Sequence, residues 1–96
     1  MKVILTTPLK DLMGNDVVNE RGDKIILSKF LANQIMLEKA ESEVMARWDL
    51  ANKLNTADGE LEIGENEKAI IKKCCEGGNM TILVAGQILK IINNAN

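Results

Sequence analysis

The sequence predicts a mostly helical α+β fold: a short N-terminal antiparallel β ribbon, then three or four helices packed around an apolar C-terminal helix. Three observations support this prediction. The chain has 96 residues, which is the length of a single domain spanning 1–96. The spacing of apolar residues changes from two to about 3.6 after Leu27. The segment 81–92 holds eight apolar side chains and one charge, Lys90.

The first 27 residues carry β and turn signals. Residues 3–6 predict a short strand, and Pro8 ends it. The apolar runs 17–18 and 25–27 predict a hairpin, with Gly22 in the loop at a position that needs positive φ. We expect no internal repeat in this region or elsewhere. A two- or three-stranded ribbon is marginal by itself, so it must pack on helices.

Four segments have helical spacing. We expect helices near residues 28–38, 43–55, 65–76 and 81–93. Ser28 is a candidate N-cap for the first helix. Whether the helix breaks at residues 38–43 or runs through them stays open. In the second helix, Val44, Met45 and Trp48 share the spacing of Ala51 and Leu54, which favours a buried stripe.

The second half of the chain begins with a short alternating segment. Residues 60–63 predict a strand that could join the N-terminal ribbon. The helix at 65–76 has glutamates in its first turn, where the helix dipole favours them, and Gly77 is a candidate left-handed residue after its end. Thr81 or Asn79 would cap the last helix.

The last helix is predicted to be the centre of the core. It is apolar around most of its circumference, so we expect protein to cover it on most sides. Gly86 in mid-helix costs about 1 kcal/mol relative to alanine, which suggests that it allows a close backbone crossing. Ile88 lies midway along this helix, and its truncation is expected to unfold or nearly unfold the protein.

Composition argues against several functional classes. The chain has no histidine and no tyrosine, so we expect no catalytic site, no metal site and no cofactor. Cys74 and Cys75 are adjacent and fit buried, reduced thiols. A net charge of −2 argues against strong binding to duplex DNA. Neither an export signal nor a membrane segment is evident, so we expect a cytoplasmic protein.

Two kinds of binding residue remain as candidates. The leading one is contact with a protein partner or with a second copy of the chain, through Trp48, Leu83, Ile88 and Ile92. The same residues also fit a core, and for Trp48 we favour the core. The alternative is a small nucleic-acid-associated regulator that uses a lysine-rich helix face made of Lys68, Lys72 and Lys73.

The sequence also resembles small proteins encoded by phages and prophages. The resemblance rests on a ribbon with a glycine turn and on the segments 27–33, 47–54, 70–72 and 84–89. These motifs are packing motifs and bring no catalytic residues with them. The resemblance implies a non-enzymatic role in assembly, or as an accessory factor, exerted through a helical surface in the host-cell cytoplasm.

Overall fold

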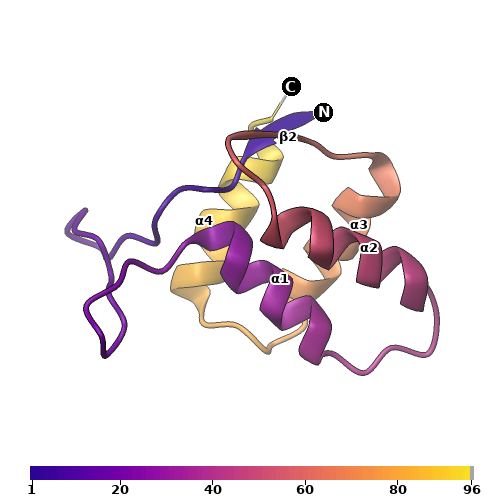
Figure 1. The fold of residues 1–96 in the computed structure, drawn as a ribbon, viewed down its shortest axis with the longest axis horizontal. Coiled ribbons are helices and arrows are strands. Elements are labelled where there is room, and N and C mark those ends of the chain that lie inside the picture. The colour runs from indigo at the N-terminus through magenta and orange to yellow at the C-terminus, as the bar shows by residue number, and fades with distance from the viewer. Residues whose placement is uncertain (96) are drawn as a thin grey trace.

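The computed structural model describes residues 1–95 and shows an α+β domain in which helices make up about half of the chain (Figure 1). In chain order the elements are β1 (Lys2–Ile4), α1 (Leu27–Leu37), α2 (Val44–Asn55), β2 (Glu60–Glu62), α3 (Glu65–Glu76) and α4 (Ile82–Asn93). The predicted fold class is confirmed, and all four helices lie within a residue of their predicted bounds. The helix does break between Leu37 and Val44, and Glu43 there has a left-handed φ of 59°.

Local signals place the helix ends, with two corrections to the prediction. At α3 the Gly64 amide donates to Glu67 Oε1 at 2.9 Å, and at α4 Thr81 Oγ1 accepts from the Val84 amide at 3.5 Å. Ser28 is not a cap: it lies inside α1, buried, and its hydroxyl has no partner among residues 1–95. The left-handed glycine after α3 is Gly78, with φ 82°, and not Gly77.

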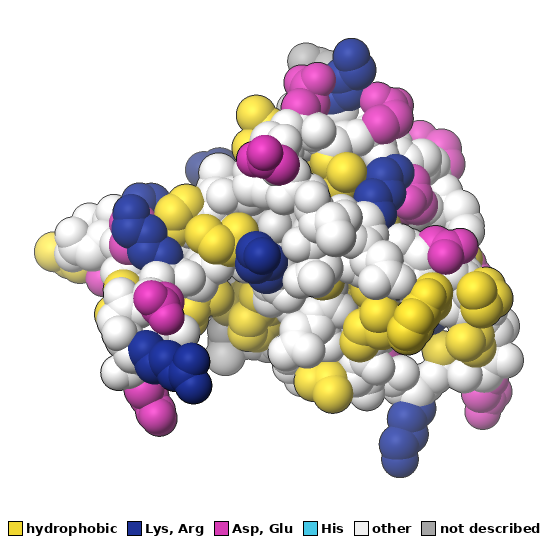
Figure 2. All heavy atoms as spheres, viewed as in Figure 1, with side chains coloured by type: hydrophobic (Ala, Val, Ile, Leu, Met, Phe, Trp, Pro, Cys, Tyr) yellow, Lys and Arg dark blue, Asp and Glu magenta, His cyan; other side chains and the backbone are white. Residues whose placement is uncertain are grey.

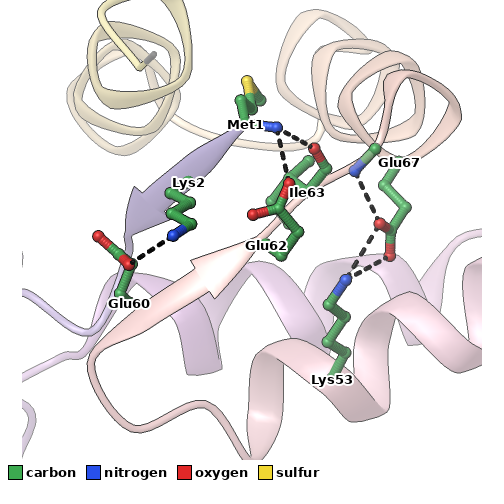
Figure 3. A network of polar contacts seen from close by, with 8 residues as sticks. Met1, Lys2, Lys53, Glu60, Glu62, Ile63 and Glu67 are labelled. Carbon is green, nitrogen blue, oxygen red and sulfur yellow. Dashed lines mark hydrogen bonds and ion pairs between the residues drawn. The ribbon is translucent and has the colours of Figure 1, made fainter.

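The only sheet in the described residues has two strands, β1 near the N-terminus and β2 about 60 residues later. β1 and β2 are antiparallel, with Val3 opposite Leu61. Figure 3 shows how the N-terminus anchors this ribbon: the Met1 amino group donates to Ile63 O at 2.9 Å and to Glu62 Oε1 at 3.1 Å. The expectation that residues 60–63 add to the N-terminal ribbon is therefore confirmed.

Residues 8–26 form a projecting element instead of a continuous hairpin, and only isolated bridges occur within it. Three backbone hydrogen bonds close a ring: Leu9 N to Ile25 O at 2.7 Å, Val17 N to Leu9 O at 2.9 Å, and Ile25 N to Val17 O at 3.2 Å. This ring holds two turns, residues 11–15 and 19–23, that project from the body at the left of Figure 1. We call residues 8–26 the double-turn loop.

The two turns of the double-turn loop are equivalent, eight residues apart. Each begins with Asp11 or Asn19, whose side-chain oxygen accepts the amides two and four residues later at 2.9–3.1 Å. Each has glycine at the fourth position, Gly14 with φ 87° and Gly22 with φ 85°. The expectation of no internal repeat was wrong. The two turns share only the Asp or Asn at the first position and the Gly at the fourth, and the residues between these positions differ, so the sequence does not show the repeat plainly.

The core lies between the helices and the ribbon and has one continuous cluster of buried side chains. Its fully buried members come from all four helices, the β1 region and the segment after β2. α4 contributes Val84, Ala85, Ile88 and Ile92, and the last two have no exposed surface. Thus α4 is a central element of the core. The prediction that protein covers it on most sides is wrong, because one side is open to solvent and Ile82 there is 90% exposed.

Gly86 does not mark a backbone crossing. It is exposed on α4, and a Cβ atom added there would meet nothing within 4 Å. The inference of close packing at this glycine was therefore wrong. The face of α4 that carries Gly86 and Ile82 is turned away from the core.

Candidate interaction surfaces

The first half of α2 and the end of α1 expose a group of large apolar side chains. Trp48 is 53% exposed, and its neighbours on the surface are also uncovered. We call the set the α1–α2 surface: Met36, Leu37, Val44, Met45 and Trp48. Figure 2 shows apolar side chains gathered over this part of the molecule, at the lower right. The prediction that Trp48 lies in the core is wrong.

Helical geometry explains why α2 has two apolar sides. Leu50, Ala51 and Leu54, in its second half, are buried against α1 and the rest of the core. Val44 and Met45 begin the helix beyond the edge of that core, and Trp48 follows Val44 by one turn on the same outward side. The helical spacing of apolar residues in α2 thus includes both a buried group, Leu50, Ala51 and Leu54, and an exposed group, Val44, Met45 and Trp48.

A hollow of about 220 Å³ opens beside Trp48, between the end of α1 and the start of α2. Its walls include Ile35, Met36, Ala40 and Val44. The ion pair between Arg47 Nη1 and Glu38 Oε2, at 3.1 Å, also borders it, and both side chains are about 15% exposed. Arg47 Nε is buried and has no hydrogen-bond partner among residues 1–95. The hollow therefore combines apolar walls with an ion pair at its border, which suits a binding surface.

A second apolar surface lies where the double-turn loop meets the start of α4. Leu12 is 96% exposed and Ile82 is 90% exposed. We call the set the loop–α4 surface: Leu12, Met13, Ile82 and Leu83. An open hollow of about 680 Å³ at this junction is lined by Leu12, Ile82 and Leu83 together with exposed polar groups. Leu12 and Met13 lie within a turn, and apolar residues inside a turn signal are the sequence feature that could have revealed this surface.

Gln87 fixes the double-turn loop against α4. Its side-chain Nε2 donates to Lys10 O at 2.7 Å, and its Oε1 accepts from Lys10 N at 3.0 Å. The amide therefore pairs with the backbone of Lys10 as a neighbouring strand would. In addition, Asp16 accepts from Lys10 and, at 3.0 Å, from Lys24, and these hydrogen bonds lower the pKa of the Asp16 carboxyl. These contacts order the loop that presents Leu12.

The four predicted partner contacts separate into two groups. Trp48 belongs to the α1–α2 surface and Leu83 to the loop–α4 surface. Ile88 and Ile92 are completely buried within the chain. Because they have no exposed surface, they hold the core together and offer nothing to a partner in this structure.

The lysines of the nucleic-acid alternative do not form one face. Lys68 and Lys72 are four residues apart on α3, on the same side of the helix. Lys73 lies on another side and approaches Glu43, with 3.7 Å between Nζ and Oε1. Two glutamates begin α3 and a third ends it. The lysines are thus interspersed with acids, an arrangement that favours an ordinary solvated helix over a phosphate-binding stripe.

The cysteines are free and buried, as predicted. Burial raises the pKa of both thiols; that of Cys75 rises to about 11, and Glu76 and Glu38 add to the effect. A thiol that keeps its proton is a poor nucleophile and a poor metal ligand. Among residues 1–95 no group of acidic or cysteine side chains could hold a metal ion.

No family model, curated protein or solved structure is significantly similar to this chain. Over the described residues, none of the helices has the length and apolar character that crossing a membrane requires.

Proposed function

We propose that this protein is a non-enzymatic interaction protein that binds a protein partner through the α1–α2 surface. The exposed Trp48 beside an apolar hollow is the observation that carries the proposal. Tryptophan is among the residues that contribute most to binding at protein interfaces, especially next to a pocket that excludes water. Exposed apolar groups that gather in one place are typical of such interfaces, whereas single exposed ones are ordinary.

The chemistry of the chain supports a non-enzymatic role. It has no histidine or tyrosine, and its only two thiols are buried with raised pKa values. General acid–base and nucleophilic catalysis both require a titratable or activated group in an accessible site. The resemblance in sequence to small phage and prophage proteins is the support for proposing a role in assembly or as an accessory factor. The neighbouring genes test that origin directly.

Binding to purified products of neighbouring genes tests the proposed surface. In Trp48→Asp, a charge replaces the aromatic anchor at an exposed position, so the fold persists while partner binding falls by at least about tenfold. Val18→Asp is the matched control, because Val18 is 51% exposed and outside both apolar surfaces. It introduces the same charge and should bind like the parent. Unchanged binding by Trp48→Asp, with circular dichroism showing the parent fold, would overturn the proposal.

A further inference from the structure

Three of the five methionines have exposed side chains, and two of these three lie in the α1–α2 surface. Met45 is 65% exposed and Met36 is 42% exposed, whereas Met1 and Met80 are half-buried and pack against the core. The third exposed methionine, Met13, lies in the double-turn loop. The α1–α2 surface therefore carries two thioether side chains that are open to solvent.

Both of these methionines lie beside Trp48, which anchors the proposed contact. Met45 precedes Trp48 by three residues in α2, so the two side chains are neighbours on one side of the helix. Met36 is at the end of α1 and lines the same hollow as Trp48. A change in the polarity of either methionine therefore changes the apolar surroundings of the tryptophan.

Methionine is an apolar residue that a mild oxidant makes polar. Hydrogen peroxide transfers one oxygen atom to the thioether sulfur: an S–O bond forms, the O–O bond breaks, the sulfur loses two electrons and the peroxide is reduced to water. The resulting sulfoxide accepts hydrogen bonds, so its burial in an apolar interface without a donor disfavours binding. Methionine sulfoxide reductases reverse the reaction, taking two electrons from a dithiol and releasing the oxygen as water.

The fold does not require either methionine to stay apolar. The buried residues of the two helices are other ones: Leu27, Ser28, Leu31, Ala32 and Ile35 in α1, and Leu50, Ala51 and Leu54 in α2. The other two oxidisable sulfurs that are not thioethers, those of Cys74 and Cys75, are buried as protonated thiols, which react slowly with peroxide. Peroxide therefore alters the α1–α2 surface while the core stays intact.

We propose that Met36 and Met45 are oxidation sites that control the α1–α2 surface, with peroxide as the oxidant. As thioethers they extend the apolar surface around Trp48. As sulfoxides they prevent the partner from docking there, and the fold is unchanged. The inference rests on the proposed function, since oxidation regulates the same surface. Met13 lies outside that surface, so its oxidation leaves the contact unchanged.

Peroxide treatment of the full chain, ended with catalase, tests the sites. Peptide mass spectrometry should show Met13, Met45 and Met36 oxidised before Met1 and Met80, because the last two are half-buried against the core. Circular dichroism should stay that of the untreated protein. If Met36 and Met45 react no faster than Met1 and Met80, they are not accessible oxidation sites and the inference is wrong.

The apolar dye ANS, which binds exposed apolar surface, probes the effect of oxidation. Energy transfer from Trp48, the only tryptophan, reports the dye bound near it. In the parent, oxidation should lower the affinity of this dye site by about tenfold, and treatment with sulfoxide reductases should restore it. The double variant Met36→Leu, Met45→Leu keeps the apolar volume without the sulfur, so it should bind the dye equally before and after peroxide. Met13→Leu is the matched control and should respond like the parent.

Other results overturn the inference. A parent without energy transfer to the dye has no apolar surface here for oxidation to control. Dye binding that survives oxidation of both methionines shows that the sulfoxides do not block the surface. A double variant that loses the dye on treatment shows that another residue carries the response.

A neighbouring-gene product that binds the parent separates this inference from the proposed function. The chain is oxidised and freed of peroxide before mixing, so the partner itself is not oxidised. Binding that persists after oxidation but is lost in Trp48→Asp refutes the inference and leaves the proposed function standing. Binding that Trp48→Asp does not change removes the proposed function, and with it the inference.

Discussion

Replacing Gly86 by alanine should stabilise the protein, although the residue interrupts an apolar helix. Gly86 is inside α4, exposed, and a Cβ atom there would meet no other atom within 4 Å. The substitution therefore removes backbone freedom from the unfolded chain without a steric cost in the folded one. Alanine is about 0.8–1 kcal/mol more favourable than glycine inside a helix. We expect the free energy of unfolding to rise by about that amount.

Urea and thermal unfolding measure this effect. For a domain of 60–100 residues, 1 kcal/mol corresponds to about 4–8 °C in Tm. Gly86 borders the loop–α4 surface. Measurement at about 1 µM protein, below the Kd of weak interfaces, limits any association through that surface.

Gly22→Ala is the matched control. A Cβ atom at Gly22 also meets nothing within 4 Å, but its φ is 85°. The same side chain in equally open space should therefore destabilise by about 1–2 kcal/mol, because the left-handed conformation strains an alanine. A loss of stability in Gly86→Ala would refute the reasoning and would indicate that α4 is crossed closely at this point.

Four further predictions concern the core, the thiols and the loop contact. Ile88→Ala, at a completely buried position, should cost about 2–5 kcal/mol in urea unfolding; a cost below 1 kcal/mol would deny α4 its central role. Cys74 and Cys75 should react with a thiol reagent only as fast as the chain unfolds, so rapid labelling of the native protein would contradict their burial. Because the folded chain keeps the Cys75 proton up to about pH 11 while the unfolded chain loses it near pH 9, stability should fall as pH rises through that interval, and less so in Cys75→Ala. Gln87→Ala removes both hydrogen bonds to Lys10 and should cost about 1–2 kcal/mol, with faster amide exchange in the turn at residues 11–15; unchanged exchange there would show that Gln87 does not hold the loop.

The helices follow from local sequence because their signals are local. The spacing of apolar residues places each helix, and Gly64 with Glu67 starts α3 at the predicted residue. The burial of Cys74 and Cys75 follows in the same way, since they lie on the stripe that begins with Ile70. Each of these features depends on residues within about one or two turns of each other.

The candidate site followed from the sequence only in part. Tryptophan is rare in this chain, so Trp48 stood out as a possible contact, but its spacing with Leu54 matched a core position equally well. Spacing tells which residues share a side of a helix and not where the neighbouring elements end. The fully buried part of α2 begins at Leu50, and Trp48, two residues before it, lies outside the core.

Tertiary structure decided what the sequence left open on α4 and in the double-turn loop. Nearly all sides of α4 are apolar, so its sequence pattern does not indicate which face is buried. The packing of the other helices buries the face of Ile88 and Ile92 and leaves Gly86 exposed. The ring of hydrogen bonds in the double-turn loop joins backbone groups eight and sixteen residues apart, farther than the spacing of helices or strands extends. The sequence by itself determined the helices and their ends, because those depend on neighbours along the chain; the exposed surfaces depend on neighbours in space, and a chain of 96 residues has too few elements to cover every apolar side chain that it carries.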